Sequence, residues 1–226
     1  MKTKVLTSAR SRILIVEDDR ATRHLLSSLL KAADFAVVTA CDGINALQRL
    51  KKASFDLMLL DIWMPRMNGL ELLARLRNAP KRPKVVVMTS DDAPETLLQA
   101  VREQAYQYLP KPVEPKVLVD LVRRVLAAAP ATPPIEVVSA RPAWVELLVP
   151  CDREAAGRIQ SFMEHLDADL APEVREAVGF AFRELLLNAI EWGGQLDPNR
   201  ISTHRLPSGT PHVAIPHCRP RAGVQL

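Results

Sequence analysis

Apolar runs and helical stripes alternate along the first 128 residues of the chain. The runs are short, rich in Val, Ile and Leu, and end at acids, hydroxyls or turn formers, as buried strands do. Between them, apolar residues recur at three- and four-residue spacing, which is typical of amphipathic helices. The predicted strands are Ile13–Val16, Phe35–Thr39, Asp56–Leu60, Val85–Met88 and Ala105–Leu109. The predicted helices are Ala21–Ala32, Gly43–Lys51, Leu70–Arg77, Ala93–Gln104 and Pro115–Ala128.

This alternation predicts an α/β fold over residues 1–128, with a doubly wound five-stranded parallel sheet and helices on both of its faces. Residues 129–142 contain four prolines among Ala, Thr and Ser, a composition that favours a semi-rigid linker.

Beyond the linker, residues 143–202 predict a smaller α+β module. Trp144–Val149 alternates as a strand, Arg153 begins a helix that ends near Leu166, and a longer helix follows Pro172 and ends near Trp192. Residues 203–226 hold three of the five histidines and four prolines, so we expect an irregular or disordered tail there.

Charge and composition exclude several classes of function. The formal net charge is +4, but residues 200–226 contain four arginines and no acid, so the first 199 residues sum to zero. No basic face for nucleic acid is indicated, and we expect no DNA partner. Because no apolar run approaches about 20 residues and no signal peptide is evident, we expect a cytoplasmic protein without membrane contact. The three cysteines are far apart and predict reduced packing residues.

Polar side chains follow several of the predicted strands at the point where each strand ends. Glu17 and Asp18 follow the first strand, Asp61 the third, Thr89 the fourth and Lys111 the fifth. Each has an ordinary explanation alone, such as a helix cap or a turn residue. Parallel strands bring their carboxyl ends to one edge of the sheet, however, so these groups are expected to meet. Clustered carboxylates suit Mg²⁺, and an ammonium with a hydroxyl suits a phosphoryl group.

At this point residues 10–128 resemble the receiver domain of two-component response regulators, which has a flavodoxin-like fold. The resemblance rests on the order and spacing of Leu-Ile-Val-Glu-Asp-Asp at residues 14–19, Asp61 with Met-Pro and Gly, Val-Met-Thr-Ser at 87–90, and Lys-Pro at 111–112. It implies that Asp61 is the phosphoacceptor and is phosphorylated by a sensor histidine kinase, a phosphotransfer protein or a small donor.

The same resemblance implies roles for the surrounding residues. Asp18, Asp61 and the backbone carbonyl of Trp63 would hold Mg²⁺, and Glu17 would act through bound water. Thr89 and Lys111 would contact the phosphoryl oxygens.

Tyr108 lies three residues before Lys111, and the resemblance implies that its ring moves when Thr89 is drawn toward the phosphoryl group. An aromatic residue in a strand is more often a packing residue, so both interpretations of Tyr108 stay open.

Residues 143–199 resemble the first part of a histidine-kinase-type ATPase domain, closest to the anti-sigma-factor serine kinases. The resemblance rests on Val-Glu-Leu-Leu-Val-Pro at 145–150 and Arg-Glu-Leu-Leu-Leu-Asn-Ala at 183–189, and it implies that Glu184 and Asn188 form a vestigial nucleotide and Mg²⁺ site. The adenine-reading Asp-x-Gly-x-Gly box and the Gly-rich lid are missing, so we expect no ATP binding. A pair four residues apart is also ordinary on a solvated helix surface.

The sequence therefore predicts a phosphorelay response regulator, a phosphoacceptor and not an enzyme, whose incomplete output module contacts a partner such as a sigma-factor pathway protein. One alternative is a receiver-controlled Ser/Thr kinase that uses Glu184 and Asn188. A second is a transcription regulator, which the missing basic face disfavours. Whether the receiver forms a homodimer stays open.

Overall fold

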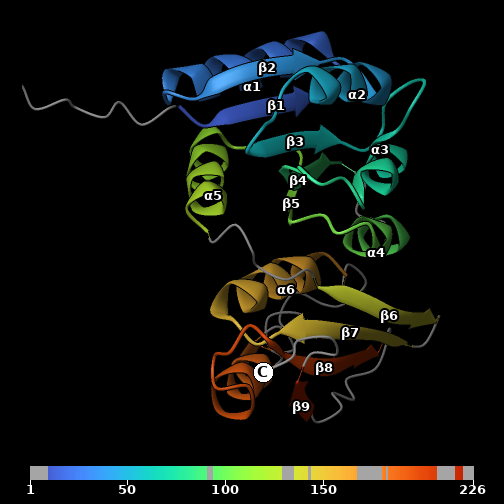
Figure 1. Cartoon of the computed structure of the whole chain (residues 1–226), viewed down its shortest axis with the longest axis vertical. Helices are drawn as coiled ribbons and strands as arrows, with labels where there is room; N and C mark the ends of the chain where they lie inside the picture. The colour runs from blue at the N-terminus through green and yellow to red at the C-terminus, as the bar shows by residue number, and fades with distance from the viewer. Residues whose placement is uncertain are drawn as a thin grey trace, which may run out of the picture. The chain divides into compact units, whose positions relative to one another are not determined.

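A computed structural model of the chain (Figure 1) describes residues 10–90, 94–128, 135–141, 144–166, 180–181, 183–207 and 217–220. The chain divides into two compact units. The first comprises Met1–Met88 with Pro112–Ala127, and the second comprises Thr89–Lys111 with Ala128–Leu226.

The predicted five-stranded sheet is confirmed, with the strand order β2-β1-β3-β4-β5. Its strands are β1 (Arg12–Val16), β2 (Ala36–Ala40), β3 (Leu57–Asp61), β4 (Lys84–Thr89) and β5 (Gln107–Pro110). β1 pairs in parallel with β2 and β3, and β3 pairs in parallel with β4. The interiors of β1, β3 and β4 are almost fully buried, which is the expected state of strands covered by helices on both faces.

The five helices of this α/β fold begin and end within a few residues of the predicted positions. They are α1 (Arg20–Ala32), α2 (Gly43–Lys52), α3 (Gly69–Leu76), α4 (Pro94–Arg102) and α5 (Pro115–Ala127). Three of them begin at capping residues. The side chains of Asp19, Asp42 and Asn68 accept hydrogen bonds from backbone amides three residues later, at 2.7, 2.8 and 2.8 Å. These caps satisfy amides that the first helical turn leaves without partners.

The second unit contains an antiparallel four-stranded sheet with the order β6-β7-β8-β9. The strands are β6 (Glu136–Arg141), β7 (Trp144–Pro150), β8 (Arg200–Pro207) and β9 (His217–Pro220). Helix α6 (Arg153–Leu166) follows β7, and residues 183–188 are helical and continue into a π-helical turn, η1 (Ala189–Gly193). The predicted start of this last helix, after Pro172, lies outside the described residues.

Two segments of the second unit differ from the sequence-based expectation. Residues 136–141, expected within a linker, form β6 and pair with β7. Residues 203–207 and 217–220, expected in an irregular tail, belong to β8 and β9. Backbone pairing to β7 and to each other explains both differences, because a sheet ladder satisfies the backbone whatever the local composition favours. The rest of the linker, at 129–134 and 142, and the tail at 208–216 and 221–226 lie outside the described part.

The three cysteines are free thiols, as the sequence predicts. Cys151 is fully buried, and burial raises the pKa of its thiol to about 12. Its Sγ lies 3.9 Å from Sγ of Cys218, whose thiol donates to the carbonyl of Ala189. Both act as packing groups beside η1. Within the described ranges, no helix is both long and apolar enough to cross a membrane.

A buried polar pair lies on β8. The Ser202 hydroxyl and Nε2 of His204 share a hydrogen bond of 2.6 Å, and both residues are almost completely excluded from solvent. Burial disfavours the charged imidazolium and lowers the pKa of His204 from 6.5 to about 4. The folded state therefore holds this side chain neutral.

The stability of the second unit should consequently depend on pH. The unfolded chain binds a proton at His204 near the ordinary pKa, whereas the folded chain resists protonation until about pH 4. Stability should fall as the pH is lowered through this window, by roughly 2 kcal/mol from about pH 7 to about pH 5. Urea denaturation of the wild type and of His204→Asn at several pH values measures this loss, which should be smaller in the variant. The exposed His24, changed to Asn, is the control, and an equal loss in all three proteins would contradict the assignment.

Candidate functional site

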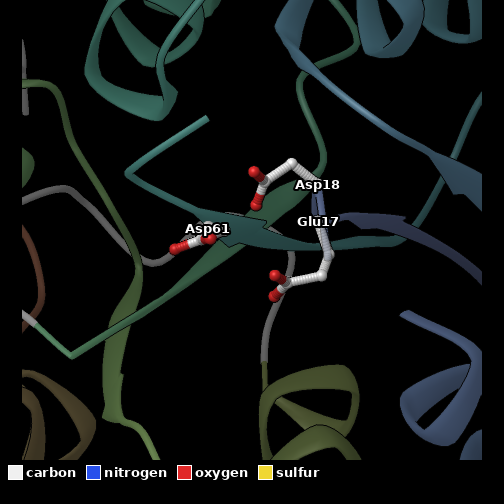
Figure 2. Close-up of side chains that lie close together, drawn as sticks. All are labelled: Glu17, Asp18 and Asp61. Atoms are coloured by element: carbon white, nitrogen blue, oxygen red, sulfur yellow. The ribbon is translucent and has the colours of Figure 1, made fainter. Parts of the chain in front are cut away.

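Three carboxylates converge at the carboxyl ends of two neighbouring strands. Glu17 and Asp18 directly follow β1, and Asp61 is the last residue of β3. The parallel register places Val16 beside Leu60, so the acids that follow are level with one another. One carboxylate oxygen from each of the three lies within 4.8 Å of the others (Figure 2). They form the one group of at least three carboxylate, imidazole or thiol ligands with this spacing among the described residues.

The three acids, called the acidic cluster below, differ in their access to solvent. Asp18 is exposed, whereas Glu17 and Asp61 are 1% and 5% exposed. Ionised carboxylates this close repel one another, and burial strengthens the repulsion because the local dielectric is lower. A divalent cation offsets this repulsion, and carboxylate oxygens are the ligands that hard divalent cations prefer.

The backbone of the acidic loop is held by Arg23 of α1. Its Nη1 donates to the carbonyl oxygen of Glu17 at 2.6 Å and to that of Asp18 at 2.9 Å. The guanidinium thereby fixes the main chain from which both carboxylates project. Asp19, the next residue, caps α1, and its hydrogen bonds with Thr22 lower the pKa of its carboxyl group.

The loop after Asp61 closes tightly on itself. The amide of Gly69 donates to the carbonyl of Ile62 at 2.8 Å, and a side chain at Gly69 would overlap the backbone oxygen of Asp61. Only glycine permits this approach. The loop contains Trp63, whose side chain is 56% exposed.

A second tie connects the same loop to α2. The Arg66 guanidinium forms an ion pair with the fully buried carboxylate of Asp42, which also caps α2. The amide of Gly43 donates to the carbonyl of Met67 at 3.2 Å. Arg66 adopts a left-handed backbone conformation, with φ 68°, which is uncommon for a residue other than glycine. The β3–α3 loop is therefore bonded to α2 as well as being closed at Gly69.

Thr89, Lys111 and Tyr108 belong to the second compact unit. Thr89 is the buried last residue of β4, directly after Met88, which pairs with Asp61 in the sheet register. The backbone amide of Lys111 donates to the carbonyl of Thr89 at 2.9 Å. Tyr108 lies on β5 and is partly buried against apolar residues of the second unit.

Glu184 and Asn188, the pair of the ATPase resemblance, lie one helical turn apart in residues 183–188. Both are exposed. Their spacing places them on one side of the helix, which is compatible with a site and equally with a solvated surface.

Sequence reasoning missed three residues that shape the site: Arg23, Asp42 and Arg66. A signal for the first exists, because Arg20 and Arg23 place positive charge in the first turn of α1, where the helix dipole favours acids. An arginine in the first turn, next to an acidic loop, suggests that its side chain has a specific hydrogen-bonding partner. The pairing of Asp42 with Arg66 joins residues 24 positions apart and leaves no local pattern.

Comparison with known proteins agrees with this geometry. Residues 13–123 match the model of the response regulator receiver domain. The response regulator protein FleR of Pseudomonas aeruginosa is 36% identical over 139 residues, which cover 61% of this chain and 29% of FleR. The transcriptional regulatory protein CpxR of Escherichia coli is 38% identical over 116 residues, covering 51% of this chain and 49% of CpxR. The chain thus spans no more than about half of these curated relatives.

A solved structure is similar to about half of the chain. The chemotaxis protein CheY4 of Vibrio cholerae matches with a TM-score of 0.50 and 31% identity, over 52% of this chain and 99% of CheY4. The range of the family match, residues 13–123, contains the whole acidic cluster. Residues 13–123 of this chain are accordingly a response regulator receiver domain.

Proposed function

We propose that this response regulator accepts a phosphoryl group on Asp61 in a Mg²⁺-dependent reaction. The convergence of Glu17, Asp18 and Asp61 within 4.8 Å carries the proposal. Asp18, Asp61 and the carbonyl of Trp63 would hold Mg²⁺, and Glu17 would act through a water molecule. The donor set fits, because all of these ligands are hard oxygens.

In the proposed reaction, a carboxylate oxygen of Asp61 attacks the phosphorus of a phosphohistidine in a sensor kinase or phosphotransfer protein. A P–O bond to Asp61 forms while the P–N bond breaks, and the imidazole leaves with its electron pair. The sheet edge and the closed loop at Gly69 hold Asp61 in place for this attack. Bound Mg²⁺ would neutralise part of the negative charge on the carboxylate and phosphoryl oxygens.

Thr89 and Lys111 are proposed to contact the phosphoryl oxygens of phosphorylated Asp61. Their backbones are joined by a hydrogen bond, so a shift of one is transmitted to the other. Tyr108, three residues before Lys111, is the proposed switch residue. Phosphorylation adds charge and acceptor oxygens, and a change of this kind can reorient a nearby hydroxyl and lysine.

The C-terminal part is proposed to act as an output module without ATP chemistry. The family match ends at residue 123, and Glu184 and Asn188 are both exposed, outside the acidic cluster. The name of CpxR describes that protein as a transcriptional regulator, but the match covers only 49% of CpxR, so we do not extend this role to the present chain. We therefore propose a protein partner for this output, such as a sigma-factor pathway protein, and not DNA.

Asp61→Asn should abolish the transfer of labelled phosphate to the chain, because the amide is a poor nucleophile and carries no charge. The measurement is Mg²⁺-dependent incorporation of phosphate from a radiolabelled small phosphodonor into the full chain. Asp120→Asn, an exposed acid on α5, is the matched control and should be labelled like the wild type. Undiminished labelling of Asp61→Asn would contradict the proposed role of Asp61 as the phosphoacceptor.

Asp18→Asn should weaken Mg²⁺ binding by about tenfold or more, because the cluster loses one anionic ligand. Trp63 lies two residues after Asp61 and is exposed, so its fluorescence should report the titration. A Trp192→Phe background removes a second tryptophan that is exposed, and Trp63→Phe should remove the signal. Equal affinity in Asp18→Asn and the parent would remove Asp18 from the metal site.

The full chain should give no saturable heat with a non-hydrolysable ATP analogue and Mg²⁺ in isothermal titration calorimetry. The physical reason is the missing adenine box and lid, without which few contacts hold the nucleotide. Saturable binding that Asn188→Ala removes would instead favour the receiver-controlled kinase that uses Glu184 and Asn188.

A further inference from the structure

The loop between β3 and α3 carries the proposed Mg²⁺ ligand at position 63. Residues 62–68 form neither helix nor strand. The side chains of Ile62, Met64 and Met67 are buried, whereas those at positions 63, 65 and 66 are exposed. The position of the Trp63 carbonyl therefore depends on how the loop itself is fixed.

A strained turn lies at Arg66, within this loop. The amide of Met67 donates to the carbonyl of Pro65 at 2.8 Å, so the hydrogen bond spans a single residue, Arg66. The φ of Arg66 is 68°. A three-residue turn with positive φ at its centre is the rare and strained form of the γ-turn. Glycine adopts such a backbone readily, so an arginine there must be held by other contacts.

The side chain of Arg66 makes the first of these contacts. Its guanidinium pairs with Oδ2 of Asp42, whose carboxylate is fully buried. The other carboxylate oxygen, Oδ1, accepts the amide of Asn45 at 2.8 Å and caps α2. Without the guanidinium, a buried charge would lose its cation, which is strongly unfavourable. The ion pair therefore offsets the backbone strain at Arg66.

The main chain next to Arg66 makes a second contact with α2. The amide of Gly43, the first residue of α2, donates to the carbonyl of Met67 at 3.2 Å. A side chain at Gly43 would meet Cγ of Met67 at 2.6 Å, so the loop lies directly on the start of the helix. Asp42 and Gly43 thus hold two consecutive residues of the loop, three and four positions after Trp63.

We propose that Asp42 and Arg66 are positioning residues for the Mg²⁺ site. Their ion pair holds the turn at Arg66 and thereby keeps the Trp63 carbonyl in the geometry that binds the ion. The inference rests on the proposed Mg²⁺-dependent function and adds two residues that act through the loop. Asp42 is not part of the acidic cluster, and all of these residues belong to the first compact unit.

The sign of the effect separates positioning from a purely electrostatic role. Arg66 is a cation and Asp42 is an anion. Through charge alone, loss of Arg66 would strengthen Mg²⁺ binding and loss of Asp42 would weaken it. Through positioning, either loss releases the turn, so both losses weaken Mg²⁺ binding.

The test is a Mg²⁺ titration of the full chain, followed by the fluorescence of Trp63 in the Trp192→Phe background. Arg66→Gln removes the cation, and Asp42→Asn removes the anion but keeps a residue that caps helices equally well. Each variant should bind Mg²⁺ at least about tenfold more weakly, as is typical when a residue that orients a metal ligand is lost. The double variant should lose little more than either single variant, because the two residues act as one unit.

Arg10→Gln is the matched control. Arg10 forms an ion pair of 2.7 Å with Asp34, which also has a positive φ, of 72°. Asp34 precedes β2 at the amino edge of the parallel sheet, whereas the acidic cluster lies at the carboxyl edge. Removal of this pair should leave the Mg²⁺ affinity unchanged.

Hydrogen exchange in the absence of Mg²⁺ tests the role of the ion pair in the loop separately. The amides of residues 62–69 should exchange at least about fivefold faster in the double variant than in the wild type, while those of β1 stay unchanged. The double variant is suited to this measurement because it leaves no buried charge without its partner. Arg10→Gln should exchange like the wild type in both segments.

Two outcomes would overturn the proposal. Mg²⁺ binding by Arg66→Gln that equals or exceeds that of the wild type would leave only an electrostatic effect. Unchanged exchange of residues 62–69 would show that the ion pair does not hold the loop. If the wild type itself does not respond to Mg²⁺, the proposed metal-dependent function fails together with the positioning role, whereas a loss confined to the variants concerns the positioning role alone.

Discussion

The parallel pairing of β1 with β3 is the constraint on which the candidate site depends. Both strands are buried along their interiors, so their register is fixed by the apolar side chains that must face the helices on each side. A slip of one residue would turn those side chains to the wrong faces and would also separate Asp61 from Glu17 and Asp18. The hydrophobic core therefore sets the geometry of the carboxylates, and the charge repulsion among them is imposed by the fold.

Local sequence patterns were sufficient to predict the fold of the receiver domain. The unbroken run Leu57–Leu60 predicts a strand covered on both faces, and its members are fully buried. Helix starts follow from capping residues such as Asp19 and Asp42, whose side chains bond to amides three positions later. Because parallel strands align their carboxyl ends, the meeting of the acids could be predicted as well. The roles of Thr89, Lys111 and Tyr108 came from resemblance and remain predictions.

The C-terminal half was predicted less well, because its order depends on contacts between distant segments. β6 lies between Pro134 and Pro142 in the sequence, and β8 contains His204 and ends at Pro207. Both segments therefore resemble a spacer or a tail in composition, yet pairing with β7 makes them strands. The burial of Leu97 against residues of β7 and α6 likewise has no local signature. Arg158 is spaced like any surface arginine of an amphipathic helix, and only its contact with Tyr106, 52 residues earlier, distinguishes it.

The hydrogen bonds of Arg23 have a consequence for how the acidic loop would respond when the proposed Mg²⁺ binds and dissociates. Arg23 grips the loop by the carbonyl oxygens of Glu17 and Asp18, which are main-chain atoms. A cation fixed on the carboxylates would compete with an exchangeable ion for the same oxygens. Hydrogen bonds to the main chain instead leave the carboxylate oxygens available to the proposed Mg²⁺, so binding and release of the ion would require no local refolding.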